Sequence, residues 1–233
     1  MRPLSGRYAD GMSPETVTIA IDGRPGVSGL WMRPASARAC LVLAHGAGAG
    51  MTHRSMTAVA DGLAARGVAS LRYQFPYMEA GGRRPDVPAV AHVAVRAAVA
   101  EANRRAPDLP LFAGGRSFGG RMTSQAQAKA PLPGVRGLVF FAFPLHPAGK
   151  PGIERADHLD AVDVPMLFLQ GTSDALAELG LLRQVVERLG ERATLVLAEA
   201  ADHSFHAPAR TGRKDPEVLA DLLDATADWM QRR

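Results

Sequence analysis

Short apolar runs rich in β-branched residues alternate along the chain with longer amphipathic or alanine-rich runs. This order is typical of βαβ units, in which helices join the strands of a parallel sheet. The pattern predicts strands at Thr16–Ile21, around Leu30, and at Ala39–Ala44, Val68–Tyr73, Leu109–Gly114, Gly137–Phe143, Met166–Gln170 and Thr194–Leu197. It predicts helices at about Arg54–Arg66, Val87–Arg105, Phe118–Lys129, Leu179–Leu189 and Pro216–Gln231, with a short helix near Ile153–Leu159. We therefore expect an α/β fold with a mainly parallel central sheet and helices on both faces.

The same pattern indicates a single domain over residues 1–233. A chain of 233 residues fits one larger α/β domain, and no internal repeat or low-complexity tract divides it. Residues 1–14 are expected to form a flexible N-terminal extension. The "DGRPG" turn joins the first two strands, and Pro144–Val164 is too short for a separate lid domain.

Composition narrows the class of protein. Hydrophobic residues make up 47% and charged residues 21%, as in ordinary globular proteins. The net charge of +4 comes from basic residues spread among nearly as many carboxylates, so we expect no nucleic-acid partner. Cys40 is the only cysteine, which excludes an internal disulfide and favours a reducing, cytoplasmic location. We find no signal-peptide pattern and no apolar run near the roughly 20 residues that cross a bilayer, so we expect no membrane association.

One short stretch is a candidate for chemistry. Gly115-Arg116-Ser117-Phe118-Gly119 is a G-x-S-x-G pattern that lies directly after an apolar strand and directly before a helix. Such a turn strains the backbone at the serine and needs small residues two positions away on each side. It holds the hydroxyl at the C-terminal edge of the sheet and aims the first amides of the helix at negative charge. Because the chain has 24 glycines, the pattern alone is weak, and its position between strand and helix carries the prediction.

Partners for Ser117 follow later strands. Asp174 comes directly after the run Met166–Gln170, and His203 comes just after the last predicted strand. The order serine, aspartate, histidine is that of one class of catalytic triad. A serine hydroxyl needs an imidazole to take its proton and a carboxylate to fix the imidazole tautomer. We therefore predict Ser117 as nucleophile, His203 as general base and then acid, and Asp174 as the orienting carboxylate.

Alternatives remain for two of these positions. His206 is a second candidate base, although it precedes Ala-Pro and is further from the strand end. Asp202 adjoins His203, yet neighbouring side chains rarely form the required hydrogen bond. Asp174 also fits a turn or helix N-cap in "TSDALAE". The sequence favours His203 and Asp174 and leaves the alternatives open.

A glycine-rich loop, "HGAGAG", follows the strand Ala39–Ala44. Glycine amides at the start of a helix attract anions, so a phosphate loop is one interpretation. However, no Lys-Ser/Thr follows, and the spacing is not G-x-G-x-x-G with a downstream acid. We therefore expect no nucleotide or dinucleotide and no other cofactor. The seven histidines have no metal-ligand spacing, so we also expect no metal.

Together, "HGAGAG", "GGRSFGG", "GTSD" and "DHSF" resemble the α/β-hydrolase fold, specifically its small lidless dienelactone-hydrolase-like members. The stretches "FPYMEAGGRRPD" and "FPLHPAGKP" resemble a single-domain group that includes testis-expressed hydrolase-like proteins of animals. The resemblance runs from about Thr16 to the C-terminus. It is specific for the fold and much less specific for the substrate.

This resemblance implies roles for backbone amides. The N–H groups of Phe118 and Ala47 would form the oxyanion hole, with Gly48 as the alternative donor, and His45 would be structural. One departure concerns the nucleophile, because dienelactone hydrolases use a cysteine where this chain has Ser117. Dienelactone chemistry is therefore in doubt.

Further residues on loops around the serine are candidates for substrate binding. The methionines and aromatic residues could line an apolar acyl or alcohol pocket, although ordinary packing explains each of them equally well. Arginines near the site would favour a substrate with a carboxylate or phosphate, although scattered arginines usually form a solvated surface. Arg116 is the most interesting of them because the elbow fixes it. The candidates are Gly46, Gly48, Met51, Tyr77, Met78, Arg116 and Phe143.

The leading hypothesis is a serine hydrolase that cleaves a small ester or thioester through an acyl-enzyme. Its partner would be a small-molecule acyl substrate. The alternatives are a catalytically silent α/β-hydrolase fold that serves as a binding or scaffold module, and perhydrolase activity on the same three residues. A homodimer is common at this size, but no stretch of the sequence argues for one.

Overall fold

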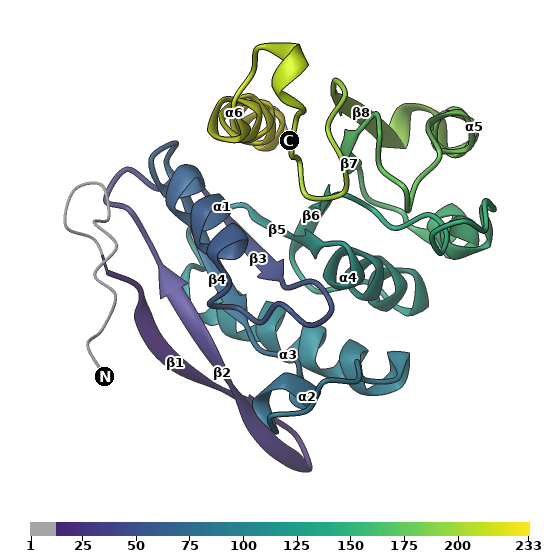
Figure 1. Cartoon of the computed structure of the whole chain (residues 1–233). Helices are drawn as coiled ribbons and strands as arrows, with labels where there is room; N and C mark the ends of the chain where they lie inside the picture. Colours follow the sequence, from purple (N-terminus) through teal and green to yellow (C-terminus); the bar gives the residue numbers. More distant parts are fainter. Residues whose placement is uncertain (1–12) are drawn as a thin grey trace.

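The computed structural model describes residues 13–233. Its centre is an eight-stranded sheet in the order β1-β2-β4-β3-β5-β6-β7-β8 (Figure 1). The expected extension, residues 1–14, lies outside the described residues except for positions 13 and 14. The strands are β1 (Glu15–Ile21), β2 (Arg24–Met32), β3 (Ala39–Ala44), β4 (Val68–Tyr73), β5 (Leu111–Arg116), β6 (Val135–Phe141), β7 (Met166–Gly171) and β8 (Ala193–Ala198).

The sheet is parallel from β4 to β8, as the pattern of strands and helices predicts. Only β1 with β2 and β2 with β4 pair antiparallel among the described strands. The chain runs from β3 outward to β4 on one side and then returns to place β5 on the other side of β3. Open α/β sheets bind ligands outside the carboxyl ends of the strands at such a reversal. The loops after β3 and β5 both lie there.

Helices cover both faces of the sheet (Figure 1). Alternate residues of β3 point into two different apolar cores, because side chains alternate along a strand. One core receives α3 (Pro88–Arg105), α4 (Phe118–Lys129) and α5 (Leu179–Leu189), and the other receives α1 (Arg54–Ala64) and α6 (Asp215–Gln231). None of the helices in residues 13–233 is long and apolar enough to span a membrane.

Some boundaries differ from those expected. The strand β5 runs to Arg116, two residues beyond the expected end, so the strand meets the serine directly. A short helix, α2 (Pro76–Glu79), lies in the segment expected to be a loop, and Pro76 at its first position presets the helical φ. The short helix after β6 is a 3₁₀ helix at Glu154–Ala161. It is the helical element between β6 and β7 in the described chain, and no lid domain is present there.

Candidate active site

The G-x-S-x-G stretch forms a sharp turn between β5 and α4. Ser117 adopts φ 49° and ψ −114°, a conformation that costs a non-glycine residue free energy. Its N–H donates to the carbonyl of Phe141 at 3.0 Å, which fixes the turn to the next strand. A Cβ added at Gly119 would lie 2.5 Å from the carbonyl oxygen of Ala44, so the helix approaches β3 only because this position is glycine.

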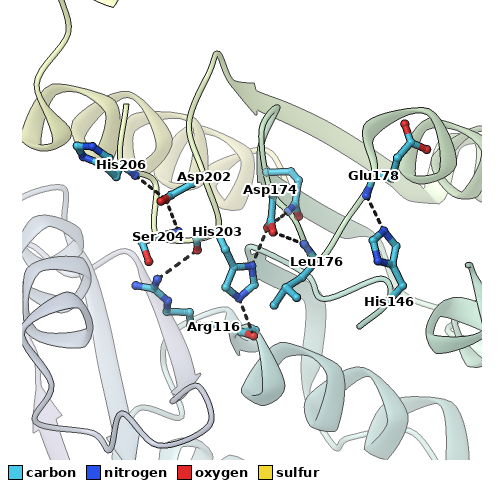
Figure 2. A network of polar contacts seen from close by, with 11 residues as sticks. Arg116, His146, Asp174, Leu176, Glu178, Asp202, His203, Ser204 and His206 are labelled. Carbon is cyan, nitrogen blue, oxygen red and sulfur yellow. Dashed lines mark hydrogen bonds and ion pairs between the residues drawn. The ribbon is translucent and has the colours of Figure 1, made fainter. Parts of the chain in front are cut away.

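His203 connects the serine to a carboxylate (Figure 2). Its Nε2 lies 2.9 Å from Oγ of Ser117, and its Nδ1 lies 2.7 Å from Oδ2 of Asp174. Because an ionised carboxylate only accepts hydrogen bonds, Nδ1 carries the proton and Nε2 is free to accept one from the serine. The structure thus brings together the three residues that the sequence predicts as nucleophile, base and orienting carboxylate.

Asp174 is fixed by more than His203. Its side chain is 0% exposed, whereas that of His203 is 25% exposed. Leu176 donates its backbone N–H to Oδ1 at 2.8 Å, and the side-chain amide of Gln170 donates to Oδ2. Gln170 is the last residue but one of β7 and is fully buried. Sequence reasoning missed this residue, although one polar side chain in the strand "MLFLQG" was a signal that it serves a buried partner.

Asp202 stabilises the loop that carries His203 through hydrogen bonds to its backbone. Its Oδ1 accepts the backbone N–H groups of Ser204 at 2.7 Å and His206 at 3.0 Å (Figure 2). Its own N–H donates to the carbonyl of His206, so the loop is closed on itself. Asp202 therefore acts on the backbone, and the carboxylate that contacts the His203 ring is that of Asp174.

His206, the other candidate base, faces away from the serine. Its Nδ1 lies 3.0 Å from both carboxylate oxygens of Asp215 at the start of α6. The hydrogen bond to Asp215 raises the pKa of His206, and the same contact lowers the pKa of Asp215. The ring is mostly exposed. The geometry thus favours His203 as the base.

The glycine-rich loop after β3 is supported by the side chains of His45 and Tyr77. His45 is fully buried, with Nδ1 2.8 Å from the carbonyl of Gly46 and Nε2 accepting the N–H of Phe75 at 3.0 Å. Burial lowers the pKa of His45, which keeps the ring neutral in this structural position. Gly48 donates its N–H to the hydroxyl of Tyr77 at 3.0 Å. Since that amide is already used, Ala47 is the better candidate for an oxyanion donor on this loop.

Phe118 begins α4. The first amides of a helix have no acceptor within the helix, so the N–H of Phe118 is available to a ligand. The Phe118 side chain packs edge-on against Phe75, with ring centroids 5.2 Å apart. This contact ties the elbow to the segment that supports His45.

The predicted substrate-binding residues lie in different parts of the structure, some in the core and some around the glycine-rich loop. Phe143 is 1% exposed and packs against Phe140 and Phe168 in the core, so this residue is corrected from a pocket residue to a core residue. Tyr77 is 7% exposed, and its hydroxyl supports the glycine loop. The remaining candidates Gly46, Met51 and Met78 are buried or half-buried around the same loop.

A cavity of about 630 Å³ opens beside the site. Its walls come from the start of α1, the start of α6, Arg116 and the segment that follows His203. Its lining includes Phe141 and Ser204 but not the side chains of Ser117 or His203. The cavity therefore lies next to the serine, bounded by the chain neighbours of both residues.

A serine at a strand-to-helix elbow, with an aspartate and a histidine on loops after later strands of a parallel sheet, defines the α/β-hydrolase class. A family model described as an alpha/beta hydrolase domain matches residues 37–231, and the chain belongs to this family. This confirms the fold class expected from the four motifs.

Solved structures share the fold. A dienelactone hydrolase from Anabaena variabilis superimposes with a TM-score of 0.75 at 20% identity, over 95% of this chain and 98% of that chain. XC6422 from Xanthomonas campestris, described as a serine hydrolase without a lid, gives 0.71 at 20% identity and 98% coverage of both chains. The esterase domain of a Rhodothermus marinus protein gives 0.71 at 16% identity, over 95% and 99%. These likenesses agree with a small lidless α/β hydrolase.

Proposed function

We propose that the protein is a serine hydrolase that cleaves a small ester or thioester through an acyl-enzyme. The observation that carries the proposal is the imidazole of His203, placed between Oγ of Ser117 at 2.9 Å and Oδ2 of Asp174 at 2.7 Å. These distances lie within hydrogen-bond reach, as proton transfer from the serine requires.

In the first half of the reaction, Oγ of Ser117 attacks the carbonyl carbon of the substrate while Nε2 of His203 takes the hydroxyl proton. The buried carboxylate of Asp174 stabilises the imidazolium that forms. The tetrahedral intermediate collapses, the bond from carbon to the leaving oxygen or sulfur breaks, and His203 gives its proton to that atom. An acyl group remains on Ser117.

In the second half, a water molecule takes the place of the leaving group. His203 removes a proton from the water as it attacks the acyl carbon, and then returns that proton to Oγ of Ser117. The products are a carboxylic acid and the free enzyme. In both halves the N–H groups of Phe118 and Ala47 would donate hydrogen bonds to the oxyanion. In other enzymes, removal of one such donor lowers kcat by roughly 10²–10³-fold.

Labelling with a fluorophosphonate tests the proposal directly. The expected result is one phosphonyl adduct, located by peptide mapping on Ser117 and absent from Ser117→Ala. The same variant should lose hydrolysis of p-nitrophenyl acetate while its thermal unfolding midpoint stays close to that of the wild type.

Two outcomes would count against the proposal. Full activity in Ser117→Ala would remove Ser117 as the nucleophile. A folded wild-type protein without any adduct would favour the alternative, a silent α/β-hydrolase fold that binds a partner.

A further inference from the structure

We propose, resting on the proposed function, that the substrate carries a carboxylate and that Arg116 binds it in the cavity beside Ser117. The proposal starts from the position of Arg116, which directly precedes the serine in the elbow and also lines the cavity. The guanidinium Nη2 of Arg116 also lies 3.2 Å from the backbone carbonyl oxygen of His203, so a charge bound there lies near the residue that contacts Oγ of Ser117.

The guanidinium of Arg116 has unused donors. Its one hydrogen bond within residues 13–233 runs from Nη2 to the backbone carbonyl of His203, at 3.2 Å (Figure 2). No carboxylate of the described residues forms an ion pair with it; Asp202 and Asp174 act on it only through their longer-range charge. Arginine has five N–H donors in a planar fork, so most of them remain for a ligand.

The guanidinium is also partly removed from water. Arg116 is only part-exposed, and burial lowers its pKa while the charges of Asp202 and Asp174 oppose that shift. An arginine stays charged at neutral pH despite such a shift. A cation that is mostly buried and has no ion-pair partner gains more from an anionic ligand than a solvated arginine does.

The rest of the cavity lining contributes a second arginine. Arg54 and two histidines, His53 and His206, line the cavity together with Arg116, and among residues 13–233 the only carboxylate in the lining is that of Asp215. That carboxylate already contacts the imidazole of His206. The cavity thus offers two arginines without offering a free acid to compete for them.

Apart from Ser55 and Ser204, the other lining residues are apolar, which indicates an organic acid rather than a bare inorganic ion. Phe141 and Phe205 are buried, and the aliphatic side chains come from α1 and α6. A carboxylate matches the planar fork of an arginine with two parallel hydrogen bonds. We therefore assign the cavity to a carboxylate and its short carbon skeleton, with the ester lying over Ser117.

Matched ester pairs test this assignment. Monomethyl glutarate and methyl valerate place the carboxylate or a methyl group on the acyl side, and 4-acetoxybenzoate and its methyl ester vary the alcohol side. The wild type should have the higher kcat/KM for the acid in at least one pair. Arg116→Gln should lower the ratio of acid to neutral kcat/KM in that pair by about tenfold or more.

Two variants serve as controls. Arg116→Lys keeps the charge but not the fork, so it should recover part of the ratio. Arg121→Gln removes an equal charge from the second turn of the helix after the elbow, outside the lining of the cavity, and should leave the ratio unchanged. If Arg116→Gln does not fold, protection answers the same question: glutarate should slow fluorophosphonate labelling of wild-type Ser117, and glutaramide should not.

The outcomes separate this inference from the proposed function. A preference for the neutral ester in both pairs, an unchanged ratio in Arg116→Gln, or equal protection by glutarate and glutaramide would overturn the carboxylate site alone. A folded wild type that hydrolyses none of the four esters and gives no adduct on Ser117 would overturn both.

Discussion

Asp174→Asn is the substitution that tests the proposed chemistry most sharply, because it changes one buried atom and hardly any volume. The carboxylate accepts three hydrogen bonds, from Gln170, from the N–H of Leu176 and from Nδ1 of His203. An asparagine has one acceptor oxygen and one NH₂ group, so in either orientation the NH₂ faces at least one of these donors. The site cannot satisfy all three contacts.

The expected consequence is a change of tautomer at His203. If the NH₂ of the new asparagine replaces Oδ2, Nδ1 must accept, and the proton moves to Nε2, where it faces the hydroxyl of Ser117. The ring then cannot take the serine proton. In a well-studied triad the same replacement lowers kcat by about 10⁴-fold, or about 5.5 kcal/mol of activation free energy. The lost hydrogen bond to a charged group should also lower the free energy of unfolding by about 1.5–3 kcal/mol.

The assay is kcat for p-nitrophenyl acetate together with urea unfolding. Asp202→Asn is the matched control, because Oδ1 of Asp202 accepts two backbone amides and an asparagine oxygen can do the same. That variant should stay within a few fold of the wild type. If Asp174→Asn kept more than a tenth of the wild-type kcat, or if Asp202→Asn lost as much, the assignment of the orienting carboxylate would be refuted.

Three more predictions use other parts of the structure. His203→Ala should lower kcat by several orders of magnitude and His206→Ala by only a few fold; equal losses would leave the base unassigned. Gly119→Ala places a Cβ 2.5 Å from the carbonyl of Ala44, so it should cost about 1–3 kcal/mol in urea unfolding, and an unchanged midpoint would show that the elbow relaxes freely. Burial lowers the pKa of His158 to about 4, whereas an unfolded histidine titrates near about 6.5. The unfolded state therefore binds the proton first, and stability should fall as the pH drops from about 6.5 to about 4. His158→Gln should lose less stability over this range, and parallel Tm curves for variant and wild type would contradict that.

The proximity of Ser117, Asp174 and His203 follows from the sequence because it depends on where strands end. Ser117, Asp174 and His203 each follow a strand, and in a parallel sheet the carboxyl ends of the strands meet at one edge. Residue type and spacing therefore suffice to bring the three side chains together. The position of the glycine-rich loop is predictable for the same reason, since the loop follows β3 at that edge.

Side-chain directions beyond the strand ends are harder to predict. Phe143 follows β6 just as Asp174 follows β7, yet it points into the core. Ala142 adopts φ 58°, which ends β6 and turns the next side chain toward Phe140 and Phe168. Alanine gives no sequence signal for this conformation, because glycine is the usual residue there. The role of Gln170 was also not predicted, because it depends on the direction in which the Asp174 side chain folds back from the loop after β7.

Backbone strain in the described chain is concentrated where the chemistry is proposed. The non-glycine residues with positive φ are Ser117, Ala142, Ala200 and Phe205, and all lie on loops that follow β5, β6 or β8. Each such conformation costs of order 1–3 kcal/mol and persists only where its surroundings hold it. The elbow is held by the hydrogen bond from the N–H of Ser117 to the carbonyl of Phe141. The loop that carries His203 is held by the hydrogen bonds from its backbone N–H groups to Asp202. Because the packed sheet and helices hold this edge, the serine and imidazole are kept in one geometry before a substrate arrives, which is what a preorganised nucleophile requires.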